Sequence, residues 1–192
     1  KQDAEKLSGK GDTSQKLTLM KTSADSLKKS ADALNDSSLW EKKKIKKKDE
    51  KTGEEIEVED YDWDKITKAV KSFVEDYNDV VKEAGESNTK DVLRNASWMT
   101  GMTDKNSNML AKIGITIGKG NKLELDEDAL KQADISSLKT VFTGYNSFVS
   151  KISQKATGIS NAANRASATY TNNGTYSRTD SLLTSSKIDE EV

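Results

Sequence analysis

The chain has 192 residues, of which 33% are apolar and 33% charged, and its 31 basic and 32 acidic side chains leave a net charge of −1. This balance excludes a global field that would draw the chain to nucleic acid or to an anionic membrane. The sequence contains no Cys, His or Pro, which excludes disulfides, thiolate or imidazole metal ligands, and the usual general base of enzymes.

The low apolar fraction limits the core that the chain can bury. Helices with a narrow apolar stripe and a broad solvated face need fewer apolar residues than a sandwich or a doubly wound sheet. We therefore expect a mainly α-helical fold with minor β structure, in which about four helices form a bundle-like packing beside one or two short β-hairpins. No apolar run approaches the roughly 18 residues of a membrane span. The start at Lys1 instead of Met favours a processed N-terminus.

The first third of the chain predicts a polar end, a helix and a charged hairpin. Residues 1–12 are polar and contain two glycines, which predicts a mobile end. Apolar residues at alternating spacings of three and four, as in a coiled coil, predict a helix over residues 13–36. Lys-rich and Glu-rich runs then flank Thr52-Gly53, which predicts a hairpin near residues 43–59 with opposite charges facing each other. Because the acidic run neutralises the basic one, we expect no nucleic-acid patch.

The middle of the chain carries the most sustained apolar face. It predicts a helix over residues 64–84, with Asp62 or Asp64 as N-cap and Gly85 at its end. A second helical pattern covers residues 88–112, and a glycine and a polar stretch interrupt it, so it is consistent with one helix or two.

The remaining part predicts a second hairpin and a long helix. The hairpin lies near residues 114–125, where apolar residues flank a Gly- and Asn-containing turn, and Asp126 is the expected N-cap of a brief helix after it. The long helix is predicted over residues 135–168, with Asp134 before it and only alanines on the last part of its apolar stripe. Such small side chains fit either a thin internal packing or a seam for a partner.

The domain organisation follows from these elements. Residues 13–169 are expected to form a single helical domain that includes both small hairpins. Residues 170–192 are rich in Thr, Asn and Ser and predict a polar, irregular C-terminal tail.

The acidic clusters do not predict a metal or catalytic site. Alternating carboxylates, as at the start of a calcium loop, occur at Asp60, Asp62 and Asp64. The turn glycine and the bidentate glutamate of such a loop are replaced by Lys65 and Lys71, so helix capping is the better interpretation.

Two further motifs have ordinary structural explanations. The acidic run at residues 126–128 lies at a helix start, where the helix dipole favours negative charge. The GKGN segment at residues 118–121 has no Lys-Ser or Lys-Thr after it and does not open a helix, so it predicts a turn instead of a phosphate site. We therefore predict a protein that is not an enzyme, without catalytic residues, cofactor or metal, and the sequence identifies no small-molecule ligand.

Aromatic residues are the candidates for an interaction surface. Exposed aromatic side chains often anchor protein interfaces, whereas buried ones contribute to the core. The candidates are Trp40, Trp63, Trp98 and Tyr61.

Two segments resemble one protein family. Residues 68–84 contain Phe73-Val74 and Tyr77-Asn78, and this segment resembles the helix with an FV-x-x-YN pattern in flagellar filament cap proteins, the hook-associated protein 2 family. Residues 110–133 are similar to that family's L-x-x-IGI stretch, Gly-containing turn, L-x-L-D strand end and acidic helix. The resemblance is to the C-terminal region of that family and covers about residues 54–157; the tail from Gly158 does not match, and long terminal heptad segments are not evident.

The resemblance implies a non-enzymatic structural or interaction module of an exported bacterial protein. Proteins of this family cap the growing filament, assist flagellin assembly and can adhere to host surfaces, so the implied partners are a flagellin-like protein or further copies of the chain. The implied location is extracellular or at the bacterial cell surface. Two alternatives remain open: a carbohydrate- or host-surface-binding module with an aromatic such as Trp40 exposed in a groove, and a hydrolase in which two distant carboxylates meet in a pocket.

Overall fold

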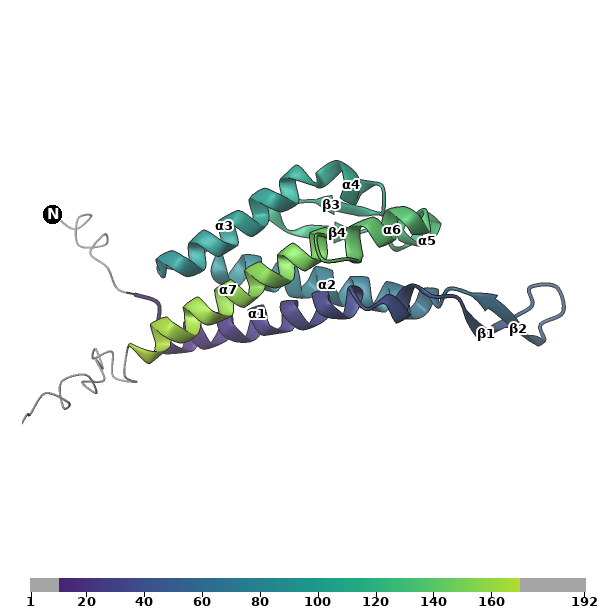
Figure 1. The fold of residues 1–192 in the computed structure, drawn as a ribbon, viewed down its shortest axis with the longest axis horizontal. Helices are drawn as coiled ribbons and strands as arrows, with labels where there is room; N and C mark the ends of the chain where they lie inside the picture. Colours follow the sequence, from purple (N-terminus) through teal and green to yellow (C-terminus); the bar gives the residue numbers. More distant parts are fainter. Residues whose placement is uncertain (1–10, 170–192) are drawn as a thin grey trace, which may run out of the picture.

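The computed structural model describes residues 11–169, in which three long helices lie side by side: α1 (Ser14–Leu34), α2 (Trp63–Ala84) and α7 (Phe148–Ala168) (Figure 1). The expected mobile end and polar tail lie almost entirely outside these residues. The other elements, in chain order, are the 3₁₀ helix η1 (Ser37–Trp40), β1 (Lys43–Lys48), β2 (Glu55–Asp60), α3 (Lys90–Lys105), α4 (Ser107–Ala111), β3 (Ile115–Ile117), the 3₁₀ helix η2 (Lys119–Asn121), β4 (Leu123–Leu125), α5 (Glu127–Gln132) and α6 (Ile135–Phe142). The predicted mainly α-helical fold with two small hairpins is confirmed.

Helices α1 and α7 pack against each other in antiparallel directions. Two hydrogen bonds fix their register: the Ser160 hydroxyl donates to Asp25 at 2.5 Å, and the Ser153 hydroxyl donates to Asp32 at 2.6 Å. Partial burial would raise the pKa of Asp25, but hydrogen bonds from Lys21 and Ser160 outweigh it and lower the pKa. Both ends of the described chain therefore lie at the same end of the bundle, and the β1–β2 hairpin extends from the other end (Figure 1).

Three alanines of α7 are packed inside the domain, whereas Ala166 is partly buried and Ala168 is exposed. Ala156 and Ala163 are fully buried, and so are Ala24 and Ala31 on α1. Small side chains let two helix backbones approach closely, so this stretch is a thin internal packing over most of its length. The stripe of α1 that faces the core is completed by larger side chains: Leu17, Met20, Leu27 and Leu34.

The long helix predicted over residues 135–168 is wrong in one respect, because it is divided into α6 and α7. Gly144 lies in the break with φ +99°, a left-handed conformation that favours glycine, and its N–H donates to the Asn35 side chain at 2.8 Å. Ser147 then caps α7 by accepting from the Ser150 N–H. Tyr145 also lies in this break, and its side chain is 82% exposed. The predicted pattern over residues 88–112 likewise forms two helices, α3 and α4.

Aromatic rings form the centre of the core at the hairpin end of the bundle. Trp40 stacks on Phe142 with ring centroids 5.6 Å apart, and Phe73 meets Phe142 and Phe148 edge to face. The Trp40 indole N–H donates to the Leu34 carbonyl at 2.7 Å, so its polar atom is satisfied inside the core. These rings join α2, α6 and α7 to the segment that leaves α1.

Helix α2 is tied to the α3–β4 region by two polar contacts. The buried Tyr77 hydroxyl donates to the Thr103 hydroxyl at 2.8 Å, and burial raises the pKa of Tyr77 to about 12. The Asn78 amide donates to the Leu123 carbonyl at 2.9 Å and accepts from the Leu123 N–H at 2.7 Å. Asn78 thus replaces a neighbouring strand along the outer edge of β4.

The first described residues are attached to the start of α3 through Asp12. Its carboxylate accepts hydrogen bonds from the Ser87 hydroxyl, from the backbone N–H of Asn88, and from both the N–H and the hydroxyl of Thr89. These contacts satisfy donors that precede α3, whose own N-cap Thr89 makes no side-chain capping bond. Burial alone would raise the pKa of Asp12, but the hydrogen bonds lower it to about 2.

We expect the stability of the fold to fall between about pH 4 and pH 2 through Asp12. The pKa of this carboxyl is about 2 in the folded chain, against 3.8 for an aspartate side chain free in water. The unfolded chain therefore binds more protons in this range, and stability is lost as the pH falls. Urea unfolding from pH 5 to pH 2 measures the effect. Asp12→Asn should reduce the slope, and an unchanged slope would contradict the assignment.

We expect Asn78→Ala to destabilise the fold by about 1–3 kcal/mol, because it leaves both backbone groups of Leu123 without their partner. Urea unfolding measures the loss, and amide exchange at Leu123 should become faster. The control is Asn78→Asp, which keeps the acceptor for the Leu123 N–H and should lose less. Unchanged exchange at Leu123 in the alanine variant would show that Asn78 does not hold β4.

Candidate interaction surface

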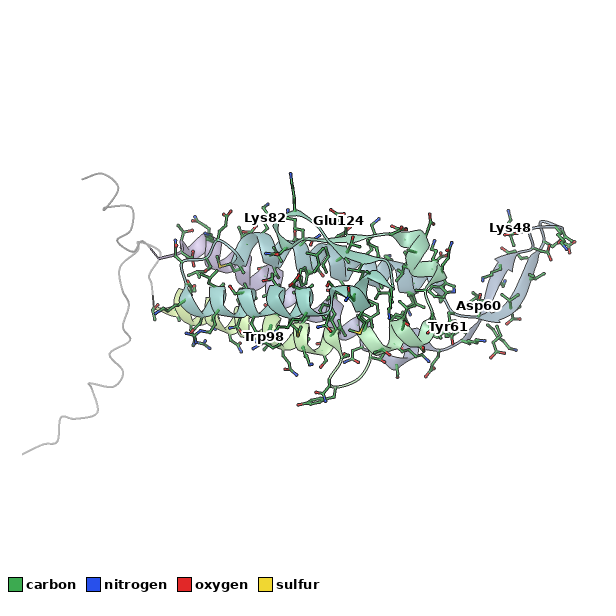
Figure 2. All side chains as sticks on the ribbon, turned by 90° about the horizontal axis from the view of Figure 1, so that it is seen from above. Lys48, Asp60, Tyr61, Lys82, Trp98 and Glu124 are labelled. Carbon is green, nitrogen blue, oxygen red and sulfur yellow. The ribbon has the colours of Figure 1, made fainter. Side chains whose placement is uncertain are left out.

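The β1–β2 hairpin is the most strongly charged feature of the described residues, and it projects beyond the helices (Figures 1 and 2). The strands pair in antiparallel register, and four lysines stand directly opposite acidic residues: Lys43 opposite Asp60, Lys44 opposite Glu59, Lys46 opposite Glu57, and Lys48 opposite Glu55. Each such pair contributes modestly because the side chains are solvated. The predicted hairpin with facing opposite charges is confirmed.

One face of the hairpin has a small apolar element. Ile45 lies opposite Val58, both are half-buried, and Ile56 on the same face is 39% exposed. The other face carries only the alternating lysines and glutamates of the two strands. A hairpin of two strands is marginal by itself, so attachment to the bundle at its base contributes to its order.

Tyr61 and Trp63 lie at this base, where β2 leads into α2. Their rings meet edge to face with centroids 6.2 Å apart, and the Lys42 ammonium is 5.7 Å from the Tyr61 ring centroid. Both residues are half-buried, so part of each ring remains available to a partner. The structure brings these two predicted residues together. Asp62 caps α2 by accepting from the Lys65 N–H, as expected.

The other two predicted aromatic residues lie apart from this base. Trp40 is only 2% exposed, and we remove it from the interaction candidates because it packs in the core. Trp98 on α3 is 45% exposed on the outside of the bundle (Figure 2). The Lys155 ammonium of α7 lies 4.2 Å from its ring centroid, a cation–π contact that joins α3 to α7.

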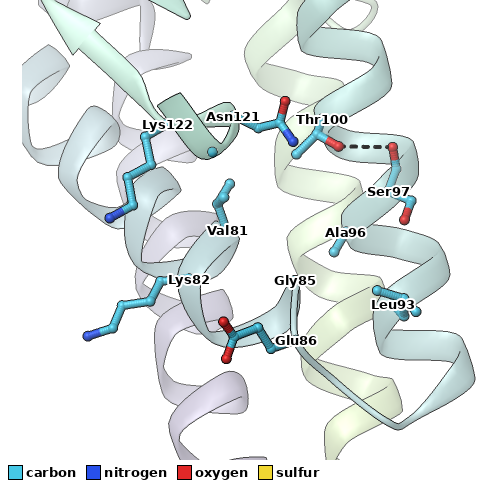
Figure 3. A pocket seen from close by; sticks show the side chains of 11 residues that line it. Val81, Lys82, Gly85, Glu86, Leu93, Ala96, Ser97, Thr100, Asn121 and Lys122 are labelled. Carbon is cyan, nitrogen blue, oxygen red and sulfur yellow. Dashed lines mark hydrogen bonds between the residues drawn. The ribbon is translucent and has the colours of Figure 1, made fainter. Parts of the chain in front are cut away.

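A groove lies between α2, α3 and the tip of the β3–β4 hairpin (Figure 3). Its volume is about 450 Å³, and its lining includes Val81 and Leu93 with Lys82, Glu86 and Lys122. Sequence reasoning missed this groove, because three elements distant in the chain form it and no local pattern marks it. The Lys155–Trp98 contact was missed for the same reason.

A smaller hollow of about 320 Å³ lies between α1 and α2 and contains one carboxylate, Asp76. Burial raises the pKa of Asp76, and the neighbouring Asp79 and Glu75 add to this shift, while a hydrogen bond from Ser30 opposes it. A hydrolase of the carboxylate type needs two acids in one pocket, and this hollow provides one. Within residues 11–169, no group of three or more acidic side chains is placed to hold a metal ion, and no helix is long and apolar enough to cross a membrane.

Comparison with known proteins identified one protein family. A family model described as the flagellar hook-associated protein 2 C-terminus matches residues 87–190, which is more than half of the chain. This match begins later than the resemblance over residues 54–157, and it also includes the tail beyond Gly158, which we did not expect to match. The comparison with curated proteins found no match, and neither did the comparison with solved structures.

The different positions of Trp40 and Trp98 predict different costs of substitution. Trp40→Ala should lose about 3–5 kcal/mol of unfolding free energy, because it leaves a cavity against Phe142. Trp98→Ala should lose about 1 kcal/mol or less, since its ring is half-exposed. Urea unfolding of the two variants measures the difference. Equal losses would contradict the assignment of Trp40 to the core and of Trp98 to the surface.

Proposed function

Because this chain belongs to the flagellar hook-associated protein 2 family, we propose that it is a non-enzymatic structural module that acts through protein contacts at the flagellar filament cap. In this proposal the protein is exported and works outside the bacterial cell or at its surface. Its partners are a flagellin-like protein, further copies of the chain, or both. The proposed task is assembly, with adhesion to host surfaces as a further role of the same kind of module.

The observation that carries this proposal is that the chain ends and the charged hairpin lie at opposite ends of the bundle. The antiparallel α1–α7 contact places both ends of the described chain at one end, and the charged hairpin extends from the other (Figure 1). Such an arrangement suits a protein that is attached through one end and meets partners with the other. The two half-buried aromatic rings at the hairpin base, Tyr61 and Trp63, would add anchoring area at that end.

The chemistry of the two hollows also supports assembly over catalysis. The larger groove combines Lys82, Lys122 and Glu86 with apolar side chains, and its lining contains no acidic pair. The smaller hollow contains a single carboxylate, Asp76. Neither lining sets two acids side by side as carboxylate catalysis requires.

The alternative, a carbohydrate- or host-surface-binding module, depends on an exposed aromatic residue in a groove. Trp40 is buried against Phe142. Trp98 is exposed, but it lines neither of the two hollows. No observation on the described residues therefore favours sugar binding over assembly.

Light scattering of the 192-residue chain across a range of concentrations, with and without flagellin from the same bacterium, tests the proposal. We expect either a mass that rises with concentration or a complex with flagellin, because assembly requires protein association. A matched control is an unrelated acidic protein of similar size in place of flagellin. A strict monomer that ignores flagellin would contradict the proposal, and a glycan array would then test the alternative.

A further inference from the structure

We propose that the β1–β2 hairpin is a head-to-tail docking element for a second copy of this chain. The basic outer edge of β1 in one copy would pair with the acidic outer edge of β2 in the next. This inference rests on the proposed assembly function, and it specifies the partner and the surface through which that partner binds.

The first observation is that charge is segregated by strand. Strand β1 has the sequence KKIKKK and carries no acidic residue, whereas β2 has the sequence EIEVED and carries no basic residue. Each strand has the other as its one hydrogen-bonded neighbour among the described residues. The hairpin is therefore a ribbon with one positive and one negative edge.

The second observation is that both edges are open. The hairpin projects away from the bundle, and no helix within residues 11–169 lies along either outer edge (Figures 1 and 2). The outer edge of a strand presents backbone N–H and C=O groups that can accept another strand. The side chains there are solvated, with Lys46 and Glu55 about two-thirds or more exposed.

Segregation of charge is not needed by the hairpin itself. Lysines and glutamates that alternate along each strand would give the same number of facing opposite charges within one hairpin. They would, however, leave both edges nearly neutral. The observed segregation affects only the charge of the two outer edges. Its physical consequence is therefore a preference for the strand of another molecule that can bind there.

The charges select one mode of pairing between copies. A two-fold contact of β1 with β1 would place lysine against lysine, and a contact of β2 with β2 would place acid against acid; both are unfavourable. A contact of β1 with β2 of the next copy repeats the pairing that the hairpin already uses, as between Lys46 and Glu57. The lysines of β1 disfavour pairing of its open edge with basic or neutral strands. The acidic edge of β2 in another copy is therefore the favoured partner of β1.

The direction of the strands agrees with this mode. Within one hairpin β1 and β2 are antiparallel. When two copies stand side by side and point the same way, β2 of one is also antiparallel to β1 of the next. The contact is heterologous, so repetition would produce a closed ring or an open filament instead of a two-fold dimer.

A charge-exchange variant of the full 192-residue chain tests this inference. All lysines of β1 are changed to glutamate (Lys43, Lys44, Lys46, Lys47, Lys48), and all acids of β2 are changed to lysine (Glu55, Glu57, Glu59, Asp60). Every facing pair within the hairpin stays opposite in charge, while each edge changes sign. The variant should therefore associate with itself about as well as the original chain does.

The decisive measurement is the association between the original chain and this variant. A fluorescently labelled original chain is mixed with unlabelled original chain or with unlabelled variant, and association is followed by sedimentation. In the β1–β2 mode like charges now meet at both contacts, so we expect mixed association with the copies pointing the same way to be about ten- to a hundredfold weaker than self-association. In the mixture, contacts of β1 with β1 and of β2 with β2 become opposite in charge and turn neighbouring copies in opposite directions, so energy transfer between dyes at the chain ends distinguishes the two modes. Self-association of either chain should also weaken as salt rises, because the charges are exposed.

The outcomes separate this inference from the proposed function. Mixing as strong as self-association, with the chain ends of neighbouring copies still close together, would overturn hairpin docking, although assembly through another surface would stand. Strong mixing with the chain ends far apart would support pairing through the hairpin edges, because only same-strand contacts are then opposite in charge. A chain that binds flagellin but remains a monomer by itself would also overturn the inference and leave the proposed function intact. A chain that neither self-associates nor binds flagellin would overturn both.

Discussion

The antiparallel contact between α1 and α7 is the constraint on which the rest of the structure depends. The two helices lie more than a hundred residues apart in the chain, and their hydrogen bonds through Asp25 and Asp32 fix one register between them. Alanines fully buried on both helices allow a close approach. Because the two helices are antiparallel, the end of α1 lies beside the start of α7. The segment between them therefore has to begin and end at the same end of the bundle. Helix α2 packs along α1, and α3 along α7.

The antiparallel α1–α7 pair also determines which segment projects from the bundle. The turn from α1 to α2 occurs at the end of the bundle opposite the two chain ends, and the β1–β2 hairpin is inserted there (Figure 1). Its base is stabilised by the aromatic core around Trp40, Phe142 and Phe73. A marginal two-stranded ribbon is thus attached next to the aromatic part of the core. The charged side chains of the strands are mostly exposed to water, so their presence does not require burial of charge in the core.

Sequence reasoning succeeded where the determining forces are local. The stripes of α1 and α2, both hairpins and the acidic helix starts follow from spacing, capping and turn residues that lie close together in the chain. Asp126 is the N-cap as predicted, Asp62 is the one of two proposed caps that the structure uses, and Asp134 before the next helix caps it. The break between α6 and α7 could not be predicted in this way, because the Gly144 N–H is held by Asn35, 109 residues away. The burial of Trp40 and the groove beside α3 are likewise products of contacts between distant segments. The sequence pattern could not show which of the four aromatic candidates have exposed side chains.

The region matched by the family and the region that carries the proposed contacts are different parts of the molecule. The match covers residues 87–190, whereas α1, the hairpin and α2 precede it. Helix α2 is nevertheless joined to the matched region, because Tyr77 binds Thr103 and Asn78 binds both backbone groups of Leu123. The hairpin strands have no comparable contact with the matched region among the described residues. The family match therefore covers only part of the helical bundle and none of the hairpin. Under our proposal, the charges of the hairpin can differ between related chains without a change in the packing of the helices.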